Sequence, residues 1–227
     1  MPVCCVFSTS EIIPYSAALA QQYALLRQRQ AGGIPDTLLL LEHPPTLTLG
    51  RGSSTTDLFV PEETLRGRGI AVEYVDRGGE ITYHAPGQLV GYPILDLREH
   101  GHDLHRYLRD LEEVLLLTLA NFGLFGERIA GLTGVWVDEK KIAAIGIKVS
   151  RWISMHGFAL NINTDLTPFR RDFVPCGIRD RGVTSLAELL GEQCPTRVEV
   201  EVALLRAFSE IFDANLTFPA EMGIMPT

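Results

Sequence analysis

Cys176 is the residue whose surroundings most suggest chemistry. It lies in the turn-rich stretch "DFVPCGIRD", residues 172–180, between Pro175 and Gly177. A structural cysteine behaves as a small hydrophobe and is usually buried and inert, whereas a reactive one needs exposure and a nearby positive charge that stabilises the thiolate. Four arginines flank this cysteine in the sequence: Arg170, Arg171, Arg179 and Arg181. The setting is therefore typical of a reactive thiol.

The other three cysteines favour structural roles. Cys4 and Cys5 lie in an apolar run, and we expect both to be packed strand residues. Cys194, in "GEQCPT", is expected to be a surface or half-buried thiol. No cysteine forms a CxxC pair, and no zinc-type spacing with histidine occurs. The sequence therefore predicts no metal site at the cysteines.

The stretch "RGGEITYHAPGQLVGYP", Arg77–Pro93, is the second candidate for chemistry. It combines a diglycine beside an arginine with Thr82, His84 and Gln88 at short intervals. Glycines let a backbone approach a ligand closely. The pattern is neither a dinucleotide fingerprint nor a phosphate loop, since the GK[ST] ending is missing. These residues alone fit either a ligand pocket or a turn and a strand with one hydrogen-bonded histidine.

The remaining histidines and the lysines give weaker signals. The chain has three lysines, Lys140, Lys141 and Lys148, and on pattern alone the first two are solvated residues of a hairpin. Because successive strand residues face opposite ways, these two cannot both face the same side. His43, before a diproline, is a candidate for the mouth of a pocket, and His156 is expected to be structural or to support the pocket from behind.

A histidine cluster follows in "REHGHDLH", with His100, His102 and His105. No ligand set of established metal-site spacing accompanies it. We therefore expect these three histidines to form a solvated helix start.

The bulk composition excludes two classes of function. The chain has 227 residues, of which 46% are hydrophobic and 21% charged, as in ordinary globular proteins. Its formal net charge of −8 argues against a general nucleic-acid binder. The apolar stretch "VLLLTLANFGLF" is too short to cross a bilayer, and no signal-peptide pattern opens the chain. We therefore expect a soluble, cytoplasmic protein without nucleic-acid or membrane partners.

Strand and helix patterns are mixed, without an internal repeat or a linker. Periodicity and capping residues predict helices at 16–30, 61–65, 104–122, 185–191 and 198–212. Alternating or apolar runs predict strands at 37–43, 46–50, 70–75, 89–97 and 153–162, with a hairpin over 134–149 that turns at Asp138–Lys140. Pro93 indicates an edge strand or a bulge. The mixture predicts one α+β domain, residues 1–227, with a mixed or antiparallel sheet flanked by helices.

The run from Arg77 to Tyr92 resembles the signature of the octanoyltransferases of lipoate biosynthesis. That signature reads R-G-G, two residues, T, one residue, H, two residues, G-Q, and a Tyr four positions after the Gln, and every fixed position is present. Ala85 stands where the family more often has glycine. Further stretches resemble the family in its order: "LLLLEHPPTLTLG", "GLTGVWV", "KIAAIGIKVS", "HGFALNI" and "VPCGIRDRGVTSL". The resemblance covers about residues 15–212.

The resemblance implies an acyltransferase with a fold like the catalytic domain of biotin and lipoate protein ligases. It implies transfer of an octanoyl group from octanoyl-acyl carrier protein to a lysine of a lipoyl domain. The acceptors would be the lipoyl domains of 2-oxoacid dehydrogenase complexes and the glycine cleavage H protein. It also implies a covalent acyl-thioester intermediate and no cofactor.

Residue roles follow from the same resemblance, position by position. Cys176 would be the nucleophile and Lys141 its partner. The segments that would line the substrate site contain Arg77, Gly78, Gly79, Glu80, Ile81, Thr82, Tyr83, His84, Ala144, Ile145, Gly146, Gly157, Phe158 and Ala159.

The implied chemistry is consistent with these residue types. A free cysteine has a pKa of about 8.5, and a neighbouring ammonium group favours its reactive thiolate. Glycine backbone N–H groups can stabilise an oxyanion. Two alternatives share the fold: an ATP-dependent lipoate or biotin ligase, and a non-catalytic protein that binds acyl carriers. The presence of both Cys176 and Lys141 argues against the ligase, and the intact motifs argue against the binder.

The arginines around Cys176 allow two interpretations. By resemblance the partners are small acidic carrier domains, so a positive rim would raise the association rate. Arg66, Arg68 and Arg151 could join that rim in space. Alternatively, the arginines pair with Asp165, Asp172 or Asp180 and only hold the loop.

Overall fold

The computed structural model describes residues 2–54, 58–173 and 181–219. Cys176 and Arg179 lie outside the described residues.

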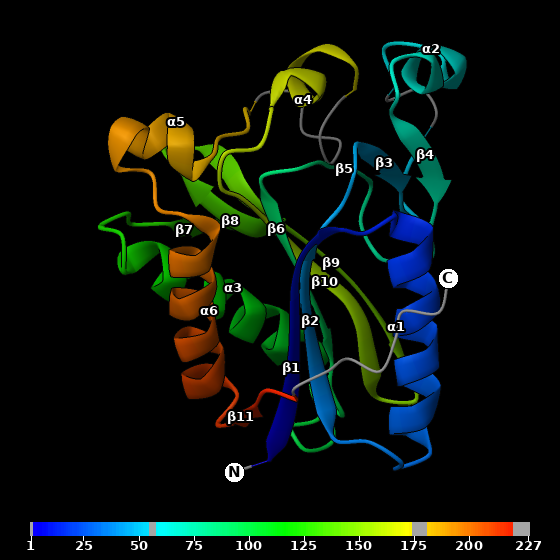
Figure 1. The fold of residues 1–227 in the computed structure, drawn as a ribbon, viewed down its shortest axis with the longest axis vertical. Helices are drawn as coiled ribbons and strands as arrows, with labels where there is room; N and C mark the ends of the chain where they lie inside the picture. The colour runs from blue at the N-terminus through cyan, green and yellow to red at the C-terminus, as the bar shows by residue number, and fades with distance from the viewer. Residues whose placement is uncertain (1, 55–57, 174–180, 220–227) are drawn as a thin grey trace.

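Within the described residues, eight strands form the main sheet, in the order β11-β1-β2-β6-β10-β9-β8-β7 (Figure 1). They are β1 (Val3–Ile12), β2 (Asp36–Glu42), β6 (Gln88–Ile94), β7 (Glu127–Ile129), β8 (Leu132–Val137), β9 (Lys140–Ser150), β10 (Ile153–Asn161) and β11 (Asn215–Thr217). β1 pairs in parallel with β2 and β11, and the other neighbours pair antiparallel. The prediction of a mixed sheet is confirmed.

A smaller sheet packs at one end of the main sheet (Figure 1). It consists of β4 (Ala71–Tyr74), β3 (Thr46–Leu49) and β5 (Ile81–His84), in that spatial order. Leu47 and Tyr83 pack with Phe169 and Phe173 in a separate core at this end. The short helices at this end are α2 (Glu62–Gly67) and α4 (Thr167–Arg171). β5 carries the "ITYH" part of the signature, so this sheet brings the signature to the main sheet.

Helices cover both faces of the main sheet (Figure 1). They are α1 (Tyr15–Gln30) on one face and α3 (Leu104–Ala120) with α6 (Arg197–Ile211) on the other, and α5 (Leu186–Leu190) precedes α6. β2 shows why both faces need a cover, because its leucines alternate between them. Leu38 and Leu40 join the core under α3 and α6, whereas Leu39 and Leu41 join the core under α1.

Local sequence signals explain where several elements begin and turn. The Asp103 carboxylate accepts hydrogen bonds from two backbone N–H groups at the start of α3. Thr196 and Glu199 form a capping box at the start of α6. Asp138 and Glu139 both have positive φ values, as a two-residue hairpin turn between β8 and β9 requires. The predicted positions of α3, α6 and this hairpin are confirmed.

The edge position expected from Pro93 is wrong, because β6 lies between β2 and β10. The continuous β6–β10 pairing ends at Gly91 and Phe158, and a single bridge joins Asp96 to Ile153 further along. Pro93 lies in this gap. A proline has no backbone N–H to donate, and the gap requires no ladder hydrogen bond at this position.

Side chains replace the ladder bonds in the gap. The Ser154 hydroxyl donates to the Pro93 carbonyl at 2.8 Å and accepts from the Leu95 N–H at 2.9 Å. The His156 N–H donates to Gln22 Oε1 of α1 at 2.8 Å, and the His156 backbone has φ +58°. The interruption therefore gives His156 a conformation that a regular strand would not allow.

Replacement of Gly157 tests how closely β6 and β10 approach. The Cβ of Gly157→Ala would lie 2.2 Å from the Gly91 carbonyl oxygen and 2.6 Å from Pro93 Cδ. Neither atom can move without shifting β6, so we expect the free energy of unfolding to fall by about 1–3 kcal/mol. Urea unfolding measures this change.

Gly67→Ala is the matched control, because its Cβ meets no atom within 4 Å. We expect this variant to be as stable as the wild type or slightly more stable, since alanine favours a helix. A Gly157→Ala protein as stable as Gly67→Ala would contradict the close approach.

Candidate active site

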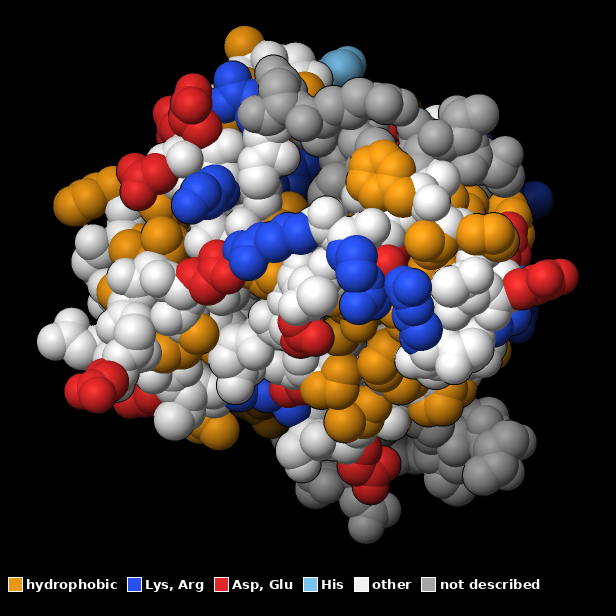
Figure 2. Space-filling model, turned by 90° about the horizontal axis from the view of Figure 1, so that it is seen from above, with side chains coloured by type: hydrophobic (Ala, Val, Ile, Leu, Met, Phe, Trp, Pro, Cys, Tyr) orange, Lys and Arg blue, Asp and Glu red, His pale blue; other side chains and the backbone are white. Residues whose placement is uncertain are grey.

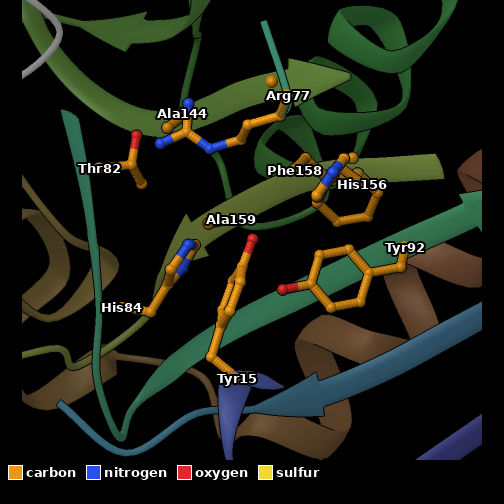
Figure 3. A pocket seen from close by; sticks show the side chains of 11 residues that line it. Tyr15, Arg77, Thr82, His84, Tyr92, Ala144, His156, Phe158 and Ala159 are labelled. Carbon is orange, nitrogen blue, oxygen red and sulfur yellow. The ribbon is translucent and has the colours of Figure 1, made fainter. Parts of the chain in front are cut away.

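A pocket lies where β5 of the small sheet meets β6, β9 and β10, beside the start of α1 (Figure 3). It is lined by Tyr15, Arg77, Thr82, His84, Tyr92, Ala144, Gly146, His156, Gly157, Phe158 and Ala159. The three segments that the resemblance selected, at 77–84, 144–146 and 157–159, thus all contribute residues to the same pocket.

Residues with small side chains on β9 and β10 form the floor of the pocket. Ala144 and Gly146 come from β9, and Ala159 comes from β10. A Cβ at Gly146 would lie 3.0 Å from the Gly78 carbonyl oxygen and 3.1 Å from Arg77 Cδ. The diglycine loop therefore rests directly on β9, and glycine at 146 allows this contact.

The loop that begins at Arg77 is bonded to both sheets. Its Nη2 donates to the Thr48 carbonyl at 3.0 Å, the Thr48 hydroxyl at 2.8 Å and the Glu80 carbonyl at 2.8 Å. The Gly78 N–H donates to the Ile147 carbonyl at 2.8 Å. The guanidinium group is buried, so the loop is fixed in place and carries a positive charge into the pocket wall.

His84 belongs to a chain of side-chain hydrogen bonds. Its Nδ1 lies 2.8 Å from Gln88 Oε1. The Gln88 amide nitrogen donates to Asn161 Oδ1 at 2.9 Å, and Asn161 Nδ2 donates to the Thr184 carbonyl at 3.0 Å. The oxygen of Gln88 therefore faces His84, and Nδ1 carries the proton. Burial holds the pKa of His84 well below its usual value, so the ring is neutral and its Nε2 is an acceptor.

His43 supports the pocket from behind. Its Nδ1 lies 2.6 Å from the Ile13 carbonyl, which can only accept, so Nδ1 carries the proton. Its Nε2 therefore accepts from the Tyr92 hydroxyl at 2.7 Å. Burial lowers the pKa of His43 to about 4. His43 is fully buried, so its expected place at the pocket mouth is wrong, and its role is to orient Tyr92.

His156 contributes another neutral ring to the pocket. Its Nε2 lies 3.3 Å from Asp76 Oδ1. Although burial opposes it, hydrogen bonds from Lys148, Tyr23 and His156 hold the pKa of Asp76 below its usual value. Burial lowers the pKa of His156 to about 4. Nε2 therefore donates to an ionised carboxylate, and Nδ1 is a buried acceptor with no partner among the described residues.

Lys141 lies in an extension of this pocket. Thr82, Ala144 and Ala159 line both parts. Lys141 is 7% exposed, whereas Lys140 is exposed. The pattern-based interpretation as a solvated hairpin residue is therefore confirmed for Lys140 and wrong for Lys141.

The backbone of Lys141 also anchors the chain that follows Cys176 in the sequence. Its N–H donates to the Gly182 carbonyl at 2.9 Å, and its carbonyl accepts from the Thr184 N–H at 3.0 Å. Val183 forms an isolated parallel bridge with Lys141. The described residues nearest to Cys176 on its C-terminal side are thus tied to the strand that carries Lys141.

Comparisons with known proteins agree with this arrangement. The lipoyl protein ligase A/B catalytic domain family matches residues 14–209. An octanoyltransferase from a Nostoc species is 52% identical over 215 residues, which cover 93% of this chain and 94% of the relative. The chain belongs to the octanoyltransferase family. It is therefore an acyltransferase.

Solved structures support the fold. A lipoate-protein ligase A bound with ATP superposes with a TM-score of 0.79 at 20% identity, covering 98% of this chain and 90% of that chain. An apo biotin protein ligase from Aquifex aeolicus gives a TM-score of 0.53 at 16% identity, covering 93% and 70%. The prediction of an α+β fold like that of these ligases is confirmed.

Only some of the residues that the family resemblance selected line the pocket. Those lining the pocket are Arg77, Thr82, His84, Ala144, Gly146, Gly157, Phe158 and Ala159. Ile81 and Tyr83 of β5 face the core of the small sheet instead, and Ile145 of β9 packs against the main core. Gly78, Gly79 and Glu80 belong to the loop that Arg77 fixes. Cys176 lies outside the described residues.

Tyr15 and Tyr92 line the pocket although sequence reasoning gave them no role. The Tyr15 ring stacks on His84, with the ring centroids 5.6 Å apart. Tyr92 was visible as the last position of the family signature, which was a usable signal. Tyr15 had no such signal, because it lies one position before the predicted helix and belongs to no motif.

Of the remaining histidine and cysteine predictions, some are confirmed and one is wrong. The His100 side chain is only 6% exposed, and its Nε2 lies 2.7 Å from Asp36 Oδ2, so its expected solvation is wrong; His102 and His105 are exposed. Cys4 is buried in β1, and Cys5 of β1 and Cys194 are half-buried, as predicted. Burial raises the pKa of the Cys4 and Cys194 thiols, so neither is prone to form a thiolate.

Several arginines near Cys176 in the sequence form ion pairs at the end of the molecule that carries α2 and α4. Basic side chains are interspersed there with acidic and apolar ones (Figure 2). Arg68 and Arg171 both pair with Asp172, at 2.6 Å and 2.8 Å. Arg170 pairs with Glu188 at 2.7 Å. The expected pairing with Asp172 is confirmed for Arg171, whereas Arg170 pairs with a carboxylate other than those expected.

Two further observations concern the described residues. No three His, Cys, Asp or Glu side chains among them are arranged to hold a metal ion. None of the described helices has both the length and the apolar character that crossing a bilayer requires.

The neutral histidines predict how stability depends on pH. In the unfolded chain a histidine protonates near pH 6.5, whereas burial lowers the folded-state pKa of His43 and His156 to about 4. Acid therefore favours the unfolded state between about pH 6.5 and 4, where only that state takes up these protons. We expect the free energy of unfolding to fall through this range, by up to about 3 kcal/mol per histidine.

Urea unfolding at a series of pH values measures this slope. His43→Gln should flatten it, because one buried neutral ring is gone. His105→Gln should not change it, since His105 is exposed. A wild-type stability that stays constant between pH 6.5 and 4 would contradict the assignment of these rings as buried and neutral.

Proposed function

We propose that this chain transfers an octanoyl group from octanoyl-acyl carrier protein to a lysine of a lipoyl domain, as a step of lipoate biosynthesis. The transfer passes through an acyl-thioester on Cys176, with Lys141 as its partner, and uses no ATP. The acceptors are the lipoyl domains of 2-oxoacid dehydrogenase complexes and the glycine cleavage H protein. The observation that carries the proposal is the buried Lys141 at one end of a pocket built from the family signature.

The state of Lys141 supports its role as the partner of a thiolate. Among the described residues, no carboxylate forms an ion pair with Lys141, whereas Lys148 pairs with Asp76 at 2.5 Å. Lys140 is exposed to water. Lys141 is therefore the lysine whose positive charge is both shielded from solvent and not neutralised by a described carboxylate. A thiolate nearby would gain most from this charge.

The first half-reaction exchanges one thioester for another. The thiolate of Cys176 attacks the carbonyl carbon of the donor thioester, and the bond from that carbon to the donor sulfur breaks. The donor thiolate takes a proton from the Lys141 ammonium group and leaves as a thiol. Because one thioester replaces another, the free energy changes little. Lys141 is left as a neutral amine.

The second half-reaction restores both groups. The neutral amine of the acceptor lysine attacks the carbonyl carbon of the acyl-cysteine, and its surplus proton passes to the Lys141 amine. The bond from carbon to Cys176 sulfur breaks, which regenerates the thiolate beside an ammonium group. Conversion of a thioester to an amide is downhill, so no ATP is needed. Lys141 acts as general acid in one step and general base in the other.

The pocket is suited to an acyl chain. Its floor consists of backbone and small side chains at Ala144, Gly146, Gly157 and Ala159. An alkyl chain laid along β9 and β10 would bury apolar surface at about 25 cal/mol per Å². The signature residues Thr82 and His84 face the same space from β5.

Intact mass spectrometry tests the nucleophile. After mixing with octanoyl-acyl carrier protein, the wild type should gain one octanoyl group, and peptide mapping should locate it on Cys176. Cys176→Ala should gain none, whereas Cys194→Ala should behave as the wild type. An adduct found mainly on Cys4, Cys5 or Cys194 would rule out the assignment.

The pH dependence of alkylation tests the partner. If the Lys141 ammonium stabilises the thiolate, Lys141→Ala should move the midpoint of Cys176 alkylation to higher pH. Lys140→Ala is the matched control from the same hairpin, and we expect its midpoint to equal that of the wild type. Equal shifts from both variants would indicate a diffuse charge effect and not a specific pair.

A further inference from the structure

Strict alternation along β9 would direct Lys141 away from the pocket. Ala144 and Gly146 face the pocket, whereas Ala143 and Ile145 belong to the main core or pack against it. In a regular strand, residues two apart share a face. Lys141 would then share the core face with Ala143, away from the pocket residues Ala144 and Gly146.

A shift of strand register changes this outcome. Val135 of β8 pairs with Ala143, but the next residue, Trp136, pairs with Lys141 and not with Ile142. Ile142 is thus an extra residue on β9, as in a β-bulge, and bulges re-aim side chains beside active sites. Ile142 packs into the core, and Lys141 faces the pocket side together with Ala144.

Gly134 of β8 leaves room for the shifted backbone and for the lysine. A Cβ there would lie 2.6 Å from the Ala143 carbonyl oxygen and 3.4 Å from Lys141 Cε. Its N–H donates to the buried carboxylate of Glu112 in α3, with the two atoms 3.2 Å apart. The irregular segment of β8 is therefore fixed from the helix behind the sheet.

Trp136 is the cross-strand partner that meets the lysine directly. Lys141 Nζ lies 4.8 Å from the centroid of the Trp136 ring, and Trp136 is only 1% exposed. An indole face attracts a cation through its quadrupole, most strongly when the pair is shielded from water. Such a face holds an ammonium group in place without using its N–H donors as a carboxylate would.

We propose that Trp136 is a positioning residue, whose indole face holds the Lys141 ammonium group in the orientation that acyl transfer requires. The bulge at Ile142 and the side-chain-free Gly134 bring the two groups together. This inference rests on the proposed function, because it takes Lys141 as the partner of the nucleophile.

Fluorinated tryptophan tests this inference without changing the shape of the site. Fluorine withdraws electron density from the ring face and so weakens a cation–π contact, while the indole keeps almost the same volume. The chain has two tryptophans, so a Trp152→Phe background confines the label to Trp136. Trp152 is partly exposed, and its ring contacts His102, away from the pocket. Tryptophan, mono-, di- and trifluorotryptophan then form a graded series.

The readout is the single-turnover rate of acylation of Cys176 by a small octanoyl thioester. We expect the rate to fall stepwise, by about 2- to 5-fold in total, since weakening a buried cation–π contact costs of order 0.5–1 kcal/mol. The free energy of unfolding should fall by no more than this same amount, about 0.5–1 kcal/mol, so that every protein in the series stays folded under the assay conditions. In a Lys141→Ala background the series should be flat, because the ammonium group is absent.

A flat series in the protein that retains Lys141, or the same slope with and without Lys141, would overturn the inference. The Lys141→Ala variant with ordinary tryptophan distinguishes a failure of the Trp136 inference from a failure of the proposed Cys176–Lys141 pair. If that variant is slow and the series is flat, only the role of Trp136 is wrong. If that variant acylates as fast as the wild type, the proposed pair of Cys176 and Lys141 is wrong, and the role of Trp136 is wrong with it.

Discussion

Backbone contact at a few glycines is the constraint on which the pocket depends. A side chain at Gly157 would collide with the Gly91 carbonyl oxygen, and a side chain at Gly91 would come within 2.1 Å of Phe158 Cζ. Gly146 allows the Arg77 loop to rest on β9. These approaches bring the small sheet, the signature loop and the main sheet within reach of one ligand. The pocket floor is therefore largely main chain, which neither rotates nor adapts as side chains do.

The charges around this rigid frame are distributed unevenly. His43, His84 and His156 are all buried, and burial lowers the pKa of each, so none of them carries a charge at neutral pH. Among the described residues that line the pocket and its extension, the positive charges belong to Arg77, whose Nη2 group already donates to oxygens of Thr48 and Glu80, and to Lys141. The histidines shape and orient the site through fixed tautomers. This distribution of charge is consistent with the thiolate-stabilising role that we propose for Lys141.

The sequence predicted the regular parts of this structure well. Helix α3 was marked by Asp103 and by its apolar periodicity, and the β8–β9 hairpin was marked by its turn. The edge position inferred from Pro93 was wrong, because the β6–β10 pairing is interrupted beside it and side chains of Ser154 and Gln22 bond to the backbone groups left there. His100 misled as well, because no local pattern announces a partner such as Asp36, which is 64 positions away. Long-range pairing of polar groups is set by the fold and leaves no trace in local spacing.

In the candidate site, too, the sequence predicted what local motifs encode and missed what depends on long-range packing. The family signature located Arg77, Thr82 and His84 at the pocket, because motif residues can be carried over by position. The side on which Lys141 lies depends on a one-residue register shift between β8 and β9. Strand alternation alone predicts the opposite face, and no residue in "KKIAAIG" marks the bulge. That shift is a property of the packed sheet.

The central claim is that Cys176 carries the acyl group on its way to the acceptor. Octanoyl-enzyme can be prepared with a small thioester, freed of donor and mixed with a lipoyl domain in the absence of ATP. The account predicts that the octanoyl group leaves Cys176 and appears on the acceptor lysine at least as fast as steady-state turnover. Acyl-enzyme that persists beside the acceptor, with acceptor modification only after addition of free octanoic acid and ATP, would contradict it.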